Sequence, residues 1–169
     1  ITDEQQAESI ASACMARYGR IDVLHNNVGI SSGDRGATSI SAETWEHIFN
    51  VNLTGVMLTC KYVLPHMREQ ASGCITNISS IAAVCKFELV SYKASKAALN
   101  AYTHSLATGG ARYGIRANVI MPGLMNTPMA IEGYVAAGHD RDELIERRNR
   151  QGPLGGTMGS AWDVANAAL

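Results

Sequence analysis

The sequence predicts an α/β fold with a parallel sheet, and two observations lead to that class. Short apolar runs bounded by glycine or proline alternate with much longer segments of helical periodicity. Strands separated by long helices cannot pair as hairpins, so they must run parallel, with helices packed on the sheet. In such folds ligands bind outside the carboxyl ends of the strands, and the loops that leave those ends here begin at Asn26, Ser79 and Met121.

The first two elements are a helix and a strand. Residues 2–18 place apolar side chains at helical spacing, and Thr2 and Gln5 have the spacing of a capping box. This amphipathic helix should end near Gly19. Residues 21–28 begin with an apolar run that is too short for a helix, which favours a strand buried on both faces, followed by a loop rich in serine and glycine.

The middle of the chain should hold two long helices around a second strand. Residues 42–69 show one broad apolar face, which predicts a single helix whose last turns are kinked by Pro65. Residues 74–78 predict a buried strand. Ser91 is placed to cap the third long helix, which should cover residues 92–113.

The last third should contain one strand and two shorter helices. Residues 115–121 predict the third strand, and an irregular stretch follows it. Helices are expected at residues 141–148 and from residue 161 onward, the second of them led by a capping box of Ser160 and Asp163.

Composition favours one folded domain spanning residues 1–169 and excludes several classes of partner. Apolar residues make up 46% and charged residues 17%, which is ordinary for a globular domain. The formal net charge is -1, from 14 basic and 15 acidic residues, so neither nucleic acid nor an anionic membrane is an expected partner.

The cysteines and the chain's hydropathy indicate a cytoplasmic protein. The four cysteines show neither metal-ligand pairing nor the spacing of a secreted disulfide scaffold, so we expect reduced, mostly buried thiols and no metal site. The first residues do not resemble a secretion signal, and the sequence lacks an apolar window long enough for a membrane span.

Tyr92 and Lys96 are the first candidates for chemistry. They stand four residues apart at the start of a predicted helix, so their side chains share one face. A phenol ionises at about pH 10, and a nearby ammonium and the positive end of the helix both favour the phenolate. The pair therefore predicts a tyrosine whose pKa is lowered for acid/base work. Taken alone, the pair also fits a solvated helix face, which is then the preferred interpretation.

Three more polar residues have two interpretations each. Ser79 and Ser80 end a predicted strand, where a hydroxyl can bind a substrate oxygen or simply form a turn. Asn52 lies inside a predicted helix, where asparagine is mildly unfavourable, so its amide either serves a site or bonds to backbone or water. The residues by themselves leave these alternatives open.

Five motifs in register carry a family resemblance. They are Asn26-Asn27-Val28-Gly29 after a strand, Asn52 in Val-Asn-Leu-Thr-Gly, Ser79 and Ser80 in Asn-Ile-Ser-Ser, the run Tyr92-Lys93-Ala94-Ser95-Lys96, and Pro122-Gly123 with Thr127. In order and spacing they resemble the short-chain dehydrogenase/reductase family over essentially the whole chain, and five motifs together are far more specific than one. The resemblance implies a Rossmann-like, doubly wound parallel sheet.

The resemblance also implies a catalytic tetrad of Asn52, Ser80, Tyr92 and Lys96. Tyr92 would be the acid/base and Ser80 would orient the reacting oxygen; Ser80 is preferred to Ser79 because family members usually use the second serine. Lys96 would lower the tyrosine pKa and hold the nicotinamide ribose, while Asn52 would position a water in a proton relay. The implied activity is hydride transfer between NAD or NADP and an alcohol or ketone.

Cofactor contacts follow from the same resemblance. Asn27 and Gly29 would lie beside the adenosine, and Tyr92 and Lys96 at the nicotinamide ribose. The residues implied around the nicotinamide amide are Pro122, Gly123, Met125 and Thr127. Gly29 and Gly123 are also simple turn glycines by composition, although close backbone approach to a ligand requires the same missing Cβ. The family further implies a homo-oligomer, a dimer or tetramer, formed through the helices that begin at Ala42 and Tyr92.

The sequence departs from the family at both ends. The glycine-rich turn that receives the pyrophosphate and the first strands are absent, and so is the last strand, so we expect a fragment or a product missing both ends. The uncovered sheet edge is expected to favour aggregation. Two alternatives to a dehydrogenase stay open: an epimerase or dehydratase of the same fold, and a remnant that only binds or oligomerises. Substrate, direction and the choice between NAD and NADP are not readable.

Overall fold

The computed structural model describes every residue except 154, and the chain divides into two compact units, Ile1–Met121 and Pro122–Leu169. Each unit is described by itself. The first holds the whole sheet and the three long helices, and the second holds three short helices.

The first unit is built on a three-stranded parallel sheet, as predicted. Its strands are β1 (Val23–Asn26), β2 (Gly73–Ile78) and β3 (Ile115–Ile120), in the order β1-β2-β3. The register pairs Asn26 at the end of β1 with Asn77 near the end of β2. The carboxyl ends of the strands therefore meet at one edge, where the chemistry was expected.

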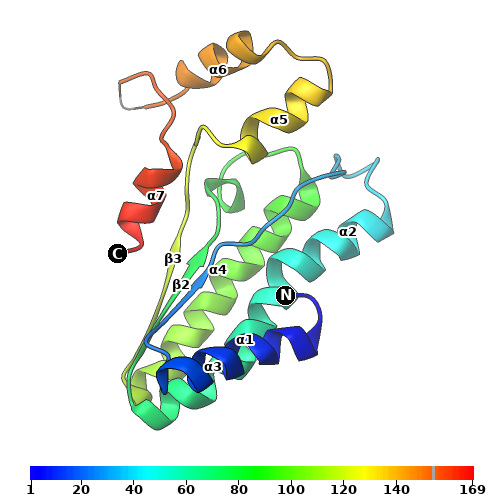
Figure 1. Cartoon of the computed structure of the whole chain (residues 1–169). Helices are drawn as coiled ribbons and strands as arrows, with labels where there is room; N and C mark the ends of the chain where they lie inside the picture. Colours follow the sequence, from blue (N-terminus) through cyan, green and yellow to red (C-terminus); the bar gives the residue numbers. More distant parts are fainter. Residues whose placement is uncertain (154) are drawn as a thin grey trace. The chain divides into compact units, whose positions relative to one another are not determined.

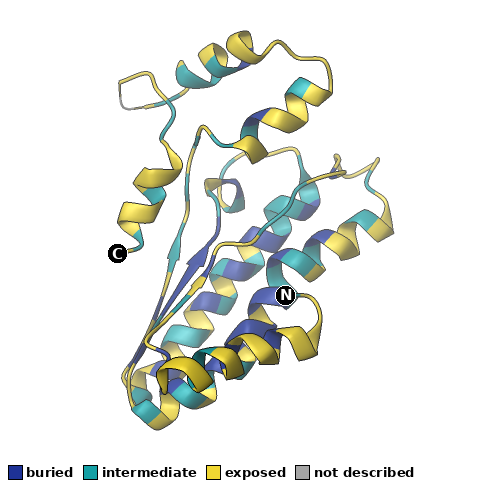
Figure 2. Cartoon of the chain, viewed as in Figure 1, coloured by how far each residue is buried: buried dark blue, intermediate teal, exposed yellow. Residues whose placement is uncertain are grey.

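Three helices lie on one face of this sheet: α1 (Glu4–Tyr18), α3 (Gly55–Gln70) and α4 (Val90–Gly110), as Figure 1 shows. α3 contacts β1 and β2, α4 contacts β3, and α1 packs on α3. In Figure 2 the buried residues of this unit are concentrated on β2, α3 and α4. The core consists of Ala11, Ile21, Val56, Cys60, Val63, Met67, Ile75, Leu99, Ile115 and Ala117.

The start of α1 differs from the prediction. The helix begins at Glu4, and Asp3 is its N-cap, with a carboxylate oxygen that accepts a hydrogen bond from the Gln6 amide at 2.8 Å. The predicted capping box at Thr2 is therefore wrong, because the acidic side chain one residue later supplies the acceptor. The predicted end is confirmed: Gly19 caps the helix at φ 71°, in the left-handed region that favours glycine.

The helix predicted over residues 42–69 is interrupted. It consists of α2 (Ala42–Phe49), a π-helical turn η1 (Asn50–Thr54) and α3, in which Pro65 is included. A π-turn adds a residue to the helical repeat and is frequent at functional sites. The apolar periodicity of the sequence continues through it, and for that reason the break was not visible.

The start of α4 also corrects a prediction. The helix begins at Val90, and Leu89 at its N-cap makes no side-chain capping bond. Ser91 lies inside the first turn and its hydroxyl is buried without a hydrogen-bond partner. The prediction that Ser91 caps this helix is therefore wrong, and the acceptor comes from Asp34, far away in the sequence.

Short 3₁₀ turns flank the two later strands. η2 (Ile81–Ala83) follows β2, and η3 (Ala111–Tyr113) links α4 to β3. The link ends at Gly114, whose φ is 67° and whose added Cβ would stand 2.5 Å from the Ala71 carbonyl oxygen. A glycine is therefore required at this turn into β3.

The second unit contains α5 (Pro128–Ala136), α6 (Arg141–Asn149) and α7 (Ala161–Ala167). The two predicted helices and the capping box of Ser160 and Asp163 are confirmed. α5 was missed although Thr127 and Pro128 are residue types preferred at an N-cap and at the first helical position; Thr127 makes no side-chain capping bond.

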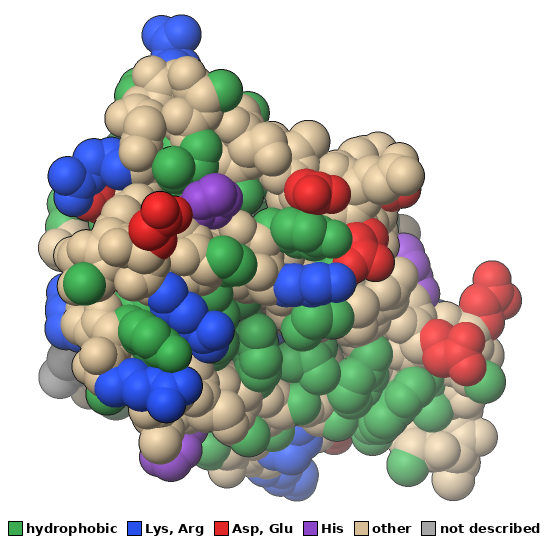
Figure 3. Space-filling view, turned by 90° about the horizontal axis from the view of Figure 1, so that it is seen from below, with side chains coloured by type: hydrophobic (Ala, Val, Ile, Leu, Met, Phe, Trp, Pro, Cys, Tyr) green, Lys and Arg blue, Asp and Glu red, His purple; other side chains and the backbone are tan. Residues whose placement is uncertain are grey.

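The remaining global predictions are partly confirmed. All four cysteines are free thiols, but only Cys60 is buried. Figure 3 shows basic, acidic and hydrophobic side chains mixed on one face of the molecule. Within the described residues, no helix has both the length and the apolar character needed to cross a membrane.

Candidate active site

A buried hydrogen-bonded network lies at the ends of β1 and β2. The Asn26 amide nitrogen donates to the Asn77 amide oxygen at 2.8 Å, and the Asn77 nitrogen donates to the Thr103 hydroxyl at 2.9 Å. The Thr59 hydroxyl donates to the Asn26 oxygen at 2.8 Å. Since all four side chains are buried, the network ties both strands to α3 and α4 without unpaired amides.

Asn52 joins the loop after β1 to α4. Its side chain is fully buried, and its oxygen accepts from the Ile30 amide at 2.8 Å while its nitrogen donates to the Ile30 carbonyl at 2.9 Å. The same nitrogen donates to the Ser95 hydroxyl at 3.1 Å. Asn52 lies in the π-turn η1. Of the two interpretations that the sequence left open, its hydrogen bonds agree with the one in which the amide bonds to backbone.

Lys96 is buried at the centre of the cluster. Its side chain is 3% exposed, and its ammonium donates to the Ile78 carbonyl at 2.8 Å. Burial lowers the pKa of Lys96 to about 8, because a charged ammonium loses hydration there. The Ser79 hydroxyl donates to the Lys96 carbonyl at 3.0 Å, so Ser79 holds backbone.

The Ser80 side chain lies near the Tyr92 hydroxyl and lowers the pKa of the phenol. Lys96 Nζ lies 5.7 Å from the centre of the Tyr92 ring. Ser80 is only half-buried and also caps η2, since its hydroxyl accepts from the Ala82 amide at 3.1 Å. Of the two candidate serines, the structure thus brings Ser80 to the phenol and turns Ser79 toward the backbone of α4.

The net direction of the Tyr92 pKa differs from the prediction. Burial raises the pKa of Tyr92, and this effect exceeds the lowering by Ser80. The expected help from the positive end of α4 is offset, because the carboxylate of Asp34 binds the first amides of that helix. The phenol is therefore held in its protonated form in this structure.

Gly29 lies close to Lys96 and Asn52, the two buried members of the expected tetrad. A Cβ added at Gly29 would stand 3.0 Å from Lys96 Nζ and 3.5 Å from Asn52 Oδ1. The φ of Gly29 is not positive, so close approach rather than backbone conformation explains the glycine. The sequence indicated a close approach at Gly29, and the nearest group there is the Lys96 ammonium.

The segment between Ser80 and α4 is fastened by Lys93. Its ammonium donates to the Ala82 carbonyl at 3.0 Å and to the Cys85 carbonyl. The Phe87 ring lies 5.8 Å from the Tyr92 ring, centre to centre, at 46°. Lys93 thus holds the turn that carries Ser80 onto the helix that carries Tyr92.

The predicted cofactor residues fall into two groups. Asn27 is exposed just past the end of β1, beside the cluster formed by Gly29 and its neighbours. The others belong to the second unit: Pro122, Gly123, Met125 and Thr127. Met125 pairs with Gly159 in an isolated parallel bridge, and Thr127 precedes α5 as its N-cap.

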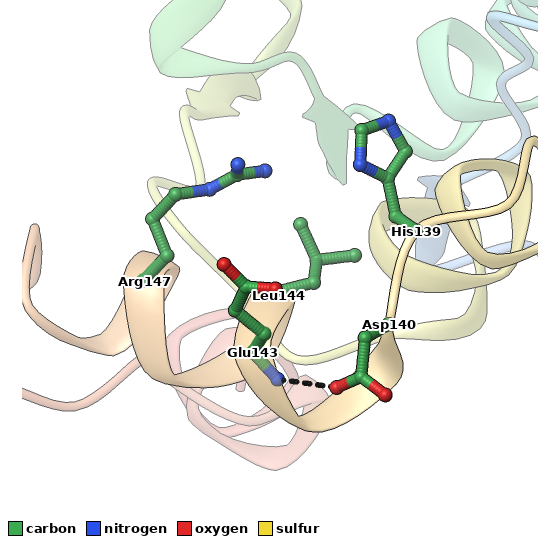
Figure 4. Close-up of a pocket in the computed structure, with 5 residues that line it drawn as sticks. All are labelled: His139, Asp140, Glu143, Leu144 and Arg147. Carbon is green, nitrogen blue, oxygen red and sulfur yellow. Dashed lines mark hydrogen bonds between the residues drawn. The ribbon is translucent and has the colours of Figure 1, made fainter.

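The second unit has a small hollow of its own, drawn in Figure 4. It is lined by His139, Asp140, Glu143, Leu144 and Arg147. The dashed bond is the N-cap of α6, from the Glu143 amide to Asp140 at 2.9 Å. It shares no residue with the predicted site.

In the part of the chain that is described, no group of three His, Cys, Asp or Glu side chains could hold a metal ion.

Two residues of the cluster were missed from the sequence. Ser95 links Asn52 to Tyr92, since its hydroxyl accepts from Asn52 and donates to the Tyr92 carbonyl at 2.9 Å. Asp34 is 4% exposed and binds the Tyr92 amide at 2.7 Å. A lone acidic residue in a loop rich in serine and glycine was the available signal for Asp34, and Ser95 stood inside a motif already quoted.

The comparison with protein families agrees with this geometry. A family model described as short chain dehydrogenase matches residues 1–134. The 2-(R)-hydroxypropyl-CoM dehydrogenase of Xanthobacter autotrophicus is 34% identical over 172 residues, a match that covers 100% of this chain and 66% of that protein.

Solved structures give the same result for the fold. The crystal structure of levodione reductase matches with a TM-score of 0.93 and 31% identity, over 99% of this chain and 65% of that one. ElxO with NADP bound matches with a TM-score of 0.87 and 30% identity, over 98% of this chain and 65% of that one. The chain therefore spans about two thirds of the length of these relatives and carries a partial Rossmann-like fold.

Proposed function

Because the chain belongs to the short-chain dehydrogenase/reductase family, we propose that it is the catalytic part of an NAD- or NADP-dependent oxidoreductase that acts on an alcohol or ketone. The observation that carries this proposal is the placement of the Ser80 side chain near the Tyr92 hydroxyl, with the buried Lys96 ammonium 5.7 Å from the ring centre.

Tyr92 is the general acid/base of the proposed reaction. In reduction its hydroxyl gives a proton to the carbonyl oxygen, and in oxidation the phenolate takes the proton of the alcohol. The cofactor supplies or accepts the hydride at the carbon. Because burial raises the pKa of Tyr92, the phenol keeps its proton before substrate arrives, which suits the donor role in reduction.

Ser80 and Lys96 assist from either side. The half-buried Ser80 hydroxyl is available to bind the reacting oxygen next to Tyr92. The Lys96 ammonium has three N–H groups and donates one of them to the Ile78 carbonyl, which leaves donors for the ribose hydroxyls. Asn52 holds the Gly29–Ile30 turn and, through Ser95, the backbone of Tyr92.

We propose cofactor contacts in each unit by itself, as the family implies them. Gly29 fits this role because a Cβ there would stand 3.0 Å from the Lys96 ammonium. Asn27 is exposed at the strand end, where an adenosine would lie. Around the nicotinamide amide we propose Pro122, Gly123, Met125 and Thr127.

Tyr92→Phe in the full-length protein tests the proposal. Since only the proton donor is removed, turnover should fall by about 10²–10⁴-fold, while the affinity for NAD(H) or NADP(H), measured by calorimetry, should stay within about twofold. Tyr18→Phe, at an exposed tyrosine of α1, is the matched control and should leave the rate unchanged. A near-normal rate in Tyr92→Phe refutes the mechanism, and absent cofactor binding at millimolar concentration supports an inactive remnant instead.

A self-associated state is part of the proposal. The helices α3 and α4 form the oligomer interface in the family this chain resembles, and Met57 on α3 is a large apolar side chain with 36% exposure. Light scattering of the purified protein should show a dimer or tetramer. A monomer at all concentrations contradicts this part.

A further inference from the structure

We propose that Asp34 is a positioning residue for the reaction: its buried carboxylate holds the backbone of Tyr92 so that the phenol meets Ser80. The inference rests on the proposed function of Tyr92 and adds a residue to it. Asp34 lies 57 and 58 positions before the amides that it binds, on a loop with no regular structure.

The first observation is the set of bonds that Asp34 makes. Its Oδ2 accepts from the Tyr92 amide at 2.7 Å, and its Oδ1 accepts from the Ser91 amide at 3.2 Å and from its own neighbour, the Arg35 amide, at 2.8 Å. The side chain is 4% exposed. A carboxylate buried this deeply requires such donors, because an unpaired buried charge is very costly.

The second observation is that α4 has no local cap. The Leu89 side chain at the N-cap cannot accept a hydrogen bond, and the Ser91 hydroxyl makes no bond. The three first amides of the helix are instead bound from one loop: Val90 by the Arg35 carbonyl at 3.2 Å, and the next two by Asp34. The start of the catalytic helix is therefore set by tertiary contact and not by its own sequence.

The third observation is that Tyr92 is held at both ends of its backbone. Asp34 binds its amide, and the Ser95 hydroxyl donates to its carbonyl at 2.9 Å. Ser95 in turn accepts from Asn52, which binds both polar groups of the Ile30 backbone. Both hydrogen bonds therefore connect the Tyr92 backbone to the loop that follows β1, one directly through Asp34 and the other through Ser95 and Asn52.

These contacts form one closed path. The loop from Gly29 to Arg35 is anchored at Ile30 by Asn52 and at Asp34 by α4, and a Cβ added to the same loop at Gly29 would stand 3.0 Å from the Lys96 ammonium. A change at Asp34 shifts the phenol relative to Ser80 while the lysine and the strand ends keep their own bonds. The expected signature is a loss of turnover without a loss of cofactor affinity.

Asp34→Asn and Asp34→Ala in the full-length protein test this role. Asparagine keeps one acceptor oxygen and alanine keeps none, so kcat should fall by about tenfold in Asp34→Asn and about hundredfold in Asp34→Ala. The cofactor dissociation constant should stay within about twofold in both. Amide hydrogen exchange should become faster in residues 90–96 and stay unchanged in α1.

Asp3→Asn is the matched control, because Asp3 is also an aspartate that caps a helix, at the exposed start of α1. It should leave kcat unchanged. Unchanged kcat in both Asp34 variants overturns the proposal, and so does an equal fall of kcat and cofactor affinity with global loss of amide protection, since that is a structural role alone. If Asp34→Ala does not fold, the Asp34→Asn result decides. The Tyr92→Phe experiment is independent: if that variant stays active, the proposed function fails, whatever Asp34 does.

Discussion

The two units of this chain differ in how their polar side chains are used. In Ile1–Met121, asparagine, threonine, serine, lysine and aspartate side chains are buried and bonded between distant elements. In Pro122–Leu169 the described ion pairs are exposed and close in sequence, such as Glu132 with Arg141, and the helix caps are local. In Figure 2 dark blue is concentrated on β2, α3 and α4 of the first unit, while α5, α6 and α7 are mostly yellow.

The difference separates a cluster of buried, hydrogen-bonded polar side chains from a segment with little core. Among the described residues of the second unit, Ile131 and Leu144 are the buried hydrophobic side chains. An element with few buried apolar contacts opens at low free-energy cost, so the second unit should open more readily than the first. Acid/base groups, in contrast, must stay within a few tenths of an ångström of their productive position.

The largest effect is expected from Asn77→Ala, in the buried network of the first unit. The change removes the partners of Asn26 and Thr103 and leaves a cavity, so the free energy of unfolding should fall by about 3 kcal/mol. Asp140→Ala, at an exposed cap of the second unit, should cost about 1 kcal/mol. Denaturant unfolding measures both, and equal costs would erase the contrast between the units.

A smaller effect is expected from Gly29→Ala. The new methyl group would press on Lys96 Nζ, which is held by the Ile78 carbonyl, so kcat should fall about tenfold, or about 1.4 kcal/mol of barrier. Gly133→Ala is the matched change in α5, where the added Cβ meets no atom within 4 Å. It should stabilise the chain by about 0.5–1 kcal/mol and leave the rate unchanged.

The smallest effect is a pH dependence of stability that Lys96 should cause. Its folded pKa of about 8 is below the ordinary value of 10.5, so above pH 8 the folded chain releases a proton that the unfolded chain keeps. Because the unfolded state then binds more protons, stability should rise with pH, by about 1 kcal/mol from pH 8 to pH 9. Lys96→Met should lack this rise in denaturant titrations at the two pH values. A parallel rise in both proteins would assign it to another group.

Much of the fold could be read from local sequence. The alternation of short apolar runs and long amphipathic segments predicted the parallel sheet, because a strand followed by a helix returns beside its neighbour in one orientation. Gly19 and the capping box of Ser160 and Asp163 were predictable because each acts within four residues of chain. The motif around Tyr92 and Lys96 placed both side chains on one helix face.

The errors have a common physical cause. The π-turn at Asn52, the cap of α4 and the direction of the Tyr92 pKa all depend on contacts between elements that are tens of residues apart. A helical periodicity continues unchanged through a π-turn, and Ser91 fits the pattern of a cap as well as many true caps do. Neither the helical periodicity nor the position of Ser91 contains information about distant contacts, such as the Asp34 carboxylate that binds the first amides of α4.

The sequence by itself determined the order of the elements, the parallel sheet and the family, because these follow from periodicity and from motifs in register. Tertiary structure alone decided which serine lies near the phenol, that burial outweighs the Ser80 hydroxyl in the pKa of Tyr92, and that Asp34 binds the first amides of the helix that carries Tyr92. The reason is that hydration and hydrogen-bond partners are properties of positions in space, and a loop between strand and helix can bring an acidic side chain to any amide within its reach.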